Sequence, residues 1–140
     1  MLKGIDPRVD PELLSRLARL GHGDLVAIVD RNFPAYRIGG AAVLPVAGLD
    51  VVGALEALLT LVPIDAFGTD PVQVMAQDDG RPSVIRDDVE ATCVRGEGRP
   101  VHVSDLHRVD FYRATSEAQL VLRTLEPRPY GCLLLRVGVV

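Results

Sequence analysis

A histidine and an aspartate flank the first strongly apolar run of the sequence. His22 lies between Gly21 and Gly23, and Asp30 follows the run directly. A histidine side chain has an ordinary pKa of about 6.5, so both of its protonation states are populated near neutral pH. An ionised aspartate accepts hydrogen bonds from hydroxyl and amide groups. The two residues are therefore candidates for proton transfer and for ligand binding.

Each of these residues also has a purely structural interpretation. His22 can end the preceding helix, where the helix dipole favours a positive charge, although a helix end does not require two glycines. Asp30 can cap the next loop through an Asx-turn, but it also follows a strand, where ligands collect in open α/β sheets. His22 precedes that strand and Asp30 follows it, and a strand of five residues spans roughly 17 Å. A single site that contains both residues therefore needs an unusual geometry or a second subunit.

Later in the chain, three further side chains are candidates for ligand contact. Arg108 and Tyr112 are four residues apart, so they lie on one face of a predicted helix, which can equally be a solvated face. Tyr130 is held between Pro129 and Gly131 in the stretch EPRPYG. Its ring can contact a ligand or pack against a neighbouring subunit.

Several other kinds of chemistry lack their usual residues. The sequence has no HExxH and no metal-ligand spacing of cysteines and histidines, so no metal is expected. The GHGD stretch follows its helix and lacks the glycine frame of a phosphate-binding loop. The net charge is −4 and the only lysine is Lys3, which argues against a nucleic-acid partner. Cys93 and Cys132 are far apart, as in a cytoplasmic protein with reduced thiols.

Strands alternate with helices along the whole sequence. Asp10, Asp50 and Ser83 are predicted to cap helices, and Gly21 to end the first of them. That first helix starts at Pro11, and further helices are predicted over 51–62, 83–95 and 105–115. Buried strands are predicted over 25–29, 72–76 and 132–137, and further strands over 101–103, 119–124 and 43–46, the last of which Pro45 restricts to an edge or an irregular place. The pattern predicts a three-layer α/β/α sandwich with a mostly parallel sheet, formed by one domain covering residues 1–140.

The chain is rich in apolar residues for its size. Of its 140 residues 48% are hydrophobic, before 13 glycines are counted, yet no apolar run is long enough for a membrane span. The excess apolar surface is therefore expected to be buried between subunits of a homo-oligomer. The N-terminus has no long apolar stretch of the kind found in a signal peptide.

Three stretches together resemble one family. The segment LKGIDPRVDPELLSRLARLGHGDLVAIVDRNFPA, the later HRVDFYRA and the final YGCLLLRVGVV resemble the fucose mutarotase branch of the ribose pyranase/fucose mutarotase family. The match runs from Lys3 to about Val139. The resemblance implies a three-layer α/β sandwich, a decameric ring with active sites near subunit contacts, and interconversion of sugar anomers without a metal or organic cofactor.

The resemblance also implies roles for individual residues. His22 matches the catalytic histidine of the family, and Asp30 and Arg108 match sugar-binding residues. Tyr130, Gly131 and position 132 match a substrate-contact stretch, to which we add Tyr112 from its position beside Arg108. The family commonly has asparagine after Tyr-Gly, whereas this chain has Cys132, whose thiol is a much weaker hydrogen-bonding group than an amide.

The resulting functional hypothesis is a cytoplasmic mutarotase that interconverts the α and β anomers of a monosaccharide, with L-fucose as the first candidate. Two alternatives stay open. One is a non-catalytic module that binds a monosaccharide or has a regulatory role, and the other is a D-ribose pyranase. The stretch DRNFPA favours the fucose branch over the ribose branch.

Overall fold

A six-stranded sheet forms the centre of the computed structural model, which describes residues 2–140. The strands are β1 (Leu25–Val29), β2 (Val43–Pro45), β3 (Val72–Met75), β4 (Val103–Leu106), β5 (Leu120–Arg123) and β6 (Leu133–Arg136). Their order across the sheet is β2-β5-β1-β6-β3-β4. Only β6 is antiparallel to its neighbours, β1 and β3, and the other three pairings are parallel. The prediction of a mostly parallel sheet is therefore confirmed.

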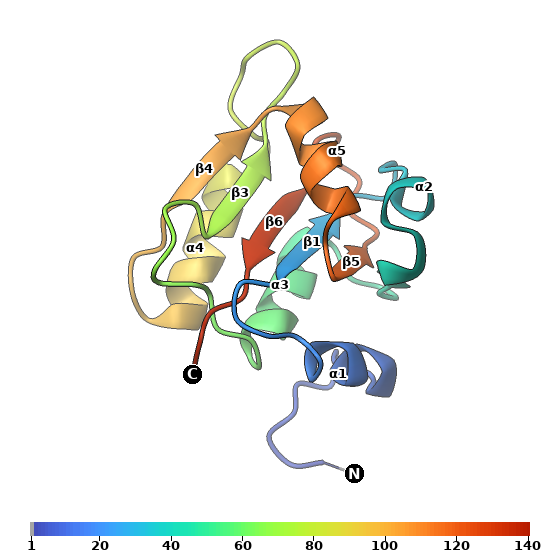
Figure 1. The fold of residues 1–140 in the computed structure, drawn as a ribbon, viewed down its shortest axis with the longest axis vertical. Coiled ribbons are helices and arrows are strands. Elements are labelled where there is room, and N and C mark those ends of the chain that lie inside the picture. The colour runs from blue at the N-terminus through green and yellow to red at the C-terminus, as the bar shows by residue number, and fades with distance from the viewer. Residues whose placement is uncertain (1) are drawn as a thin grey trace.

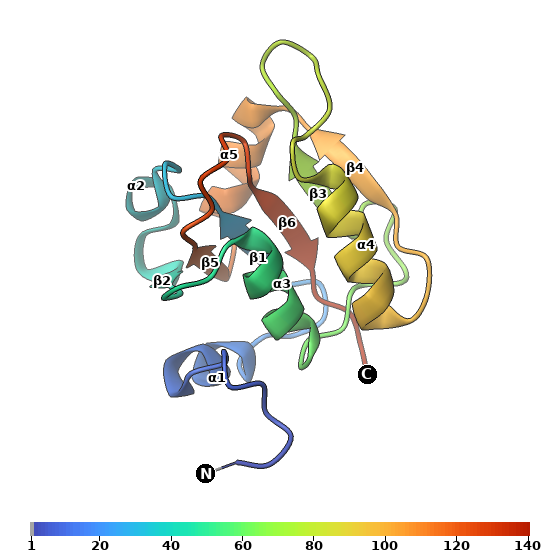
Figure 2. The same ribbon diagram turned by 180° about the vertical axis from the view of Figure 1, so that it is seen from behind.

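Helices cover both faces of this sheet. They are α1 (Pro11–Leu17), α2 (Ala35–Gly39), α3 (Val51–Leu59), α4 (Arg86–Glu97) and α5 (Arg108–Ser116), with a short 3₁₀ turn η1 (Gly40–Ala42). Figures 1 and 2 show α2 and α5 on one face and α3 and α4 on the other, which is the predicted three-layer arrangement. Among residues 2–140, no helix combines the length and the apolar character that crossing a bilayer requires.

The two apolar layers are built from alternate residues of the same strands. In β1, Val26 and Ile28 pack into the layer under α3 and α4, whereas Ala27 and Val29 pack into the layer under α2 and α5. All five residues of β1 are buried, because helices cover both of its faces. Burial on two faces explains why this strand appears in the sequence as an uninterrupted apolar run.

Side-chain capping fixes the start of two helices as predicted. The carboxylate of Asp10 accepts a 2.8 Å hydrogen bond from the Leu13 amide, and that of Asp50 accepts one of 2.7 Å from the Gly53 amide. Two other capping predictions are wrong. Helix α1 ends at Leu17 instead of reaching Gly21, and α4 begins at Arg86 rather than beside Ser83.

Two further elements differ from the prediction. Helix α2 is not among the predicted helices, because a proline at position 34 favours a loop, yet Pro34 is the N-cap residue of that helix. Proline is compatible with a helix start, where its missing N–H would have no partner in the helix. The strand predicted over 101–103 lies instead at Val103–Leu106, shifted by two residues at its start.

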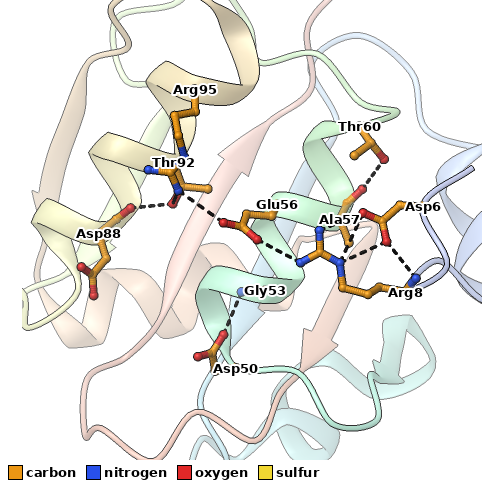
Figure 3. Close-up of polar contacts among 10 residues, drawn as sticks. All are labelled: Asp6, Arg8, Asp50, Gly53, Glu56, Ala57, Thr60, Asp88, Thr92 and Arg95. Carbon is orange, nitrogen blue, oxygen red and sulfur yellow. Dashed lines mark hydrogen bonds and ion pairs between the residues drawn. The ribbon is translucent and has the colours of Figure 1, made fainter.

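A cluster of charged side chains fastens the N-terminal segment to the helices α3 and α4. Arg8 donates to Asp6 at 2.8 Å and to Glu56 of α3 at 2.9 Å. The other carboxylate oxygen of Glu56 accepts a hydrogen bond from Nη2 of Arg95, in α4, at 3.3 Å. Figure 3 shows Glu56 lying between the two arginines. Hydrogen bonds from Arg8 lower the pKa of Asp6 to about 2 and also lower the pKa of Glu56.

This cluster predicts a loss of stability in acid. A carboxylate whose pKa is lower in the folded state stabilises that state above its unfolded pKa, and this contribution is lost as the pH falls through the folded pKa. We therefore expect the urea midpoint of the protein to exceed that of Arg8→Met at pH 6, and the difference to disappear between about pH 4.5 and pH 2. Arg113→Met, which removes only an exposed contact with Asp110, is the control. A difference that persists at pH 2 would contradict this interpretation.

Candidate active site

A cavity of about 320 Å³ opens where β1 and β3 end, beneath α5 and the loop that leads into β6. Its wall contains two carboxylates, a guanidinium and two phenol rings that come from distant parts of the chain. The lining residues are Asp30, Asn32, Phe33, Met75, Asp78, Arg108, Tyr112, Pro129 and Tyr130. Four of the predicted site residues, Asp30, Arg108, Tyr112 and Tyr130, are thus brought together. We call this the carboxylate cavity.

Asp30 is fixed in the wall by both of its carboxylate oxygens. Oδ1 accepts hydrogen bonds from the amides of Asn32 at 2.8 Å and Phe33 at 2.9 Å, which is the predicted Asx-turn. Oδ2 accepts a hydrogen bond from the Cys132 thiol at 3.3 Å. The carboxylate therefore caps the loop and faces the cavity at the same time, with capacity left on Oδ2 for a ligand hydroxyl.

Gly131 and Cys132 lie behind the wall and outside the lining. The Cys132 side chain is buried, and its Sγ also accepts from the Asp30 amide at 3.4 Å. Burial and the neighbouring Asp30 carboxylate raise the pKa of this thiol well above its usual value. The group therefore stays a neutral donor to Asp30. The substitution of cysteine for the asparagine common in the family thus changes the support of Asp30, and the thiol itself does not line the cavity.

Arg108 is oriented by a partner that sequence reasoning missed. Its Nε lies 3.0 Å from both oxygens of Asp78, in the loop after β3, and this contact raises the pKa of the guanidinium. The guanidinium carbon is 5.6 Å from the centre of the Tyr112 ring, which in turn packs edge-on against Phe33. Asp78 lies thirty positions before Arg108, and no sequence motif connects the two residues.

His22 lies at the opposite end of β1, in a second cavity of about 360 Å³. Apart from the histidine, that cavity is mainly lined by apolar residues of α1, of the segment after α3 and of the chain end. Figure 1 shows the start of β1 and the C-terminus at the same end of the sheet. Within one copy of the chain, His22 and Asp30 are therefore separated by the length of the strand, as their order along the chain predicted.

A buried aspartate orients the His22 ring. Nε2 of His22 is 3.3 Å from Oδ1 of Asp65, whose side chain is 6% exposed, whereas half of the histidine side chain is exposed. The amides of Phe67 and Gly68 also donate to Asp65 at 3.1 Å each. The hydrogen bond from the Phe67 amide lowers the pKa of Asp65, and the contact with His22 lowers it further. Burial has the opposite effect but is outweighed. An ionised Asp65 favours a proton on Nε2, which leaves Nδ1 as the basic nitrogen.

Asp65 was not identified from the sequence. It is 43 positions from His22, and neither its spacing nor its neighbours form a motif. Among residues 2–140, no three histidine, cysteine or acidic side chains are grouped closely enough to hold a metal ion.

The comparison with family models decides the relationship. Residues 3–140 match the model of the RbsD / FucU transport protein family. The chain belongs to this family. The resemblance seen in the three sequence stretches is thereby confirmed, and the match covers both cavities and the whole sheet.

Individual relatives agree with this membership. The chain is 35% identical to the human fucose mutarotase over 150 residues, which cover 99% of this chain and 94% of the relative. It superposes on the fucose mutarotase of Streptococcus pneumoniae in complex with L-fucose with a TM-score of 0.89, at 27% identity and 99% coverage of both chains. The RbsD of Bacillus subtilis complexed with D-ribose shares the fold, with a TM-score of 0.76, 22% identity, and coverage of 100% of this chain and 99% of that one.

Proposed function

We propose that this protein is a mutarotase that interconverts the α and β anomers of L-fucose. The observation that carries the proposal is the carboxylate cavity, which joins Asp30, Arg108 and Tyr130 in a chain of this family. The human relative is a fucose mutarotase and the pneumococcal one was solved with L-fucose, which supports this sugar as the substrate.

The cavity suits a ligand that is rich in hydroxyl groups. Asp30 accepts hydrogen bonds from sugar hydroxyls, and Arg108 donates several in a fixed geometry. Tyr130 offers a hydroxyl and an apolar ring. The sequence has no tryptophan, so extensive stacking on a sugar face is not available, and recognition rests mainly on hydrogen bonds. Gly131 and Cys132 contribute indirectly, through the loop and through Asp30.

His22 supplies the proton transfer. Its imidazole takes the proton from the anomeric O1 hydroxyl and delivers a proton to the ring oxygen, as the bond between C1 and the ring oxygen breaks and the C1–O1 bond becomes the carbonyl of the aldehyde. The resulting aldehyde turns, and the reverse steps close the ring on the other face of C1. Protons are conserved, and no metal or organic cofactor takes part. General acid–base catalysis of this kind typically contributes ~10²–10⁴-fold.

A complete site requires a second copy of the chain. Asp30 and His22 lie at opposite ends of β1, so one copy presents a sugar-binding half at one end and a proton-transfer half at the other. Placing the His22 end of one copy against the carboxylate cavity of another joins the halves and covers the apolar lining around His22. The decameric ring of the family and a cytoplasmic location, consistent with two free cysteines, are part of this proposal.

The separation of His22 from Asp30 within one copy is also compatible with a function that needs no catalysis. If the two ends never meet, the carboxylate cavity still binds a monosaccharide, and the protein is a non-catalytic binding or regulatory module. A D-ribose pyranase is the second alternative. The RbsD structure with D-ribose shares the fold at only 22% identity, so the fold does not favour ribose over fucose.

Saturation-transfer NMR distinguishes these functions directly. We expect the exchange between the α and β anomeric signals of L-fucose to accelerate in proportion to protein concentration. The exchange of D-ribose should accelerate less at the same protein concentration. Binding of L-fucose without faster exchange would favour the binding module. Faster exchange of D-ribose than of L-fucose would favour the pyranase.

A further inference from the structure

Tyr130 has an unusual backbone conformation for an aromatic residue. Its φ is +61°, and among residues 2–140 it is the only residue other than glycine with a positive φ. Side chains with a Cβ rarely adopt this left-handed conformation, because the Cβ crowds the neighbouring carbonyl group. Such strain persists only where the surrounding structure enforces it, and it concentrates at functional sites. Tyr130 lines the carboxylate cavity, so what enforces its conformation also shapes the cavity.

An ion pair between a buried glutamate and a partly exposed arginine lies just before Tyr130. The Glu126 side chain is 1% exposed, and its Oε1 accepts from the Arg128 amide at 3.1 Å and from Arg128 Nε at 2.7 Å. Its Oε2 accepts from Arg128 Nη2 at 3.2 Å. Burial would raise the pKa of Glu126, but the hydrogen bonds from Arg128 outweigh it and hold that pKa below its usual value. The ionised carboxylate therefore closes a tight turn over residues 126–128.

The chain after Tyr130 is packed against this ion pair. A Cβ on Gly131 would lie 2.6 Å from Cγ of Glu126 and 2.8 Å from the carbonyl oxygen of Arg128, distances too short for any larger residue. The Gly131 amide donates to that same carbonyl at 3.1 Å, and the Cys132 amide donates to the Tyr130 carbonyl at 2.8 Å. The loop is thus held on both sides of Tyr130 by contacts with Glu126 and Arg128.

The ion pair also joins this loop to the rest of the site. The Glu126 carbonyl accepts from the Arg31 amide at 3.1 Å, next to Asp30. Arg128 Nη1 reaches Asp88 of α4 at 2.9 Å. Neither Glu126 nor Arg128 lines the carboxylate cavity, so both act on it only through the loop.

We propose that Glu126 and Arg128 are positioning residues, which hold Tyr130 in its left-handed conformation so that its ring forms the wall of the carboxylate cavity before a sugar binds. The assignment of a sugar as the ligand rests on the proposed function. The positioning itself is a property of the free protein. Holding the ring in place in advance reduces the ordering cost of binding, and it therefore favours sugar affinity.

The position of Tyr130 can be measured without any sugar. The sequence has three tyrosines, so protein labelled with 3-fluorotyrosine gives three ¹⁹F signals, and Tyr130→Phe identifies the one from Tyr130. In Arg128→Met we expect this signal to shift and broaden, while that of the exposed Tyr36 stays unchanged. Glu126→Gln, which keeps the side-chain shape but removes the charge, is the second variant in case Arg128→Met does not fold. Arg95→Met, which removes an exposed ion pair of α4, is the control and should leave the Tyr130 signal unchanged.

The same variants are then titrated with L-fucose. We expect affinity to fall about fivefold to twentyfold, with the exchange rate at saturating sugar changed less than about twofold. In Arg128→Lys the Tyr130 signal should lie between those of the unmodified protein and Arg128→Met, because a lysine cannot make the bidentate contact with the Glu126 carboxylate. An unchanged Tyr130 signal in folded Arg128→Met or Glu126→Gln would overturn the proposal. If the unmodified protein shows no exchange of L-fucose, the proposed function fails, whereas the ¹⁹F result still decides the positioning.

Discussion

Replacing His22 with alanine is expected to slow the exchange of L-fucose anomers by ~10²–10⁴-fold, the usual contribution of a general acid–base group. The fold should be retained, because half of the side chain is exposed and its only hydrogen bond among the described residues is to Asp65. Saturation-transfer NMR at several sugar concentrations measures the rate. Sugar affinity should change less than the rate, since the carboxylate cavity supplies most of the hydrogen bonds to the sugar.

The Asp65 contact supplies the matched comparison. Asp65→Asn keeps the size of the side chain and can still accept from the Phe67 amide, but it no longer presents a carboxylate to Nε2. We expect a smaller loss of rate than in His22→Ala, because the imidazole is still present but less well oriented. Equal exchange rates in His22→Ala and the unmodified protein would remove His22 from the mechanism.

The second large effect is expected at Asp30. Asp30→Asn keeps an oxygen for the Asx-turn amides of Asn32 and Phe33 but removes the charge that faces the cavity. A hydrogen bond to a charged group contributes ~1.5–3 kcal/mol, so L-fucose affinity should fall roughly tenfold to a hundredfold. Calorimetric titration measures this. Asp50→Asn, which alters only the cap of α3, should leave the affinity unchanged, and a full-affinity Asp30→Asn would exclude the proposed role.

Mixing the two variants tests how the site is assembled. If each site takes His22 from one copy and Asp30 from another, a mixed oligomer of His22→Ala and Asp30→Asn chains contains some sites with both native residues. Random mixing in equal amounts should restore about one quarter of the sites. Activity that does not recover after the chains are unfolded and refolded together would contradict a site shared between two copies.

Much of the carboxylate cavity could be predicted from residue types and their places along the chain. Asp30 was predicted to follow a buried strand because five consecutive apolar residues precede it, and Arg108 and Tyr112 were predicted on one helical face from their spacing. What the sequence did not provide were the partners of these side chains. Asp65 and Glu126 are buried and Asp78 is exposed, but each of the three meets its partner through the conformation of its loop, which hydrophobic periodicity does not encode.

The direction of β6 was beyond prediction for a related reason. A strand covered on both faces reads as an apolar run in either direction, so the stretch from Leu133 to Arg136 carries no sign of its orientation. The positive φ of Tyr130 is likewise enforced by Glu126 and Arg128, through contacts visible only in three dimensions. The prolines around Tyr130 indicated a rigid loop without indicating its conformation.

The central place of β6 has a consequence for how the molecule is made. β6 is the last of the six strands along the chain, yet it is the one that joins β2, β5 and β1 to β3 and β4. Until it has been synthesised, the two groups of strands have no shared neighbour, and pairing over long sequence separations is slow to form. Folding is therefore expected to finish late, and a ribosome that stalls before Leu133 leaves two incomplete half-sheets with open edges as targets for chaperones and proteases.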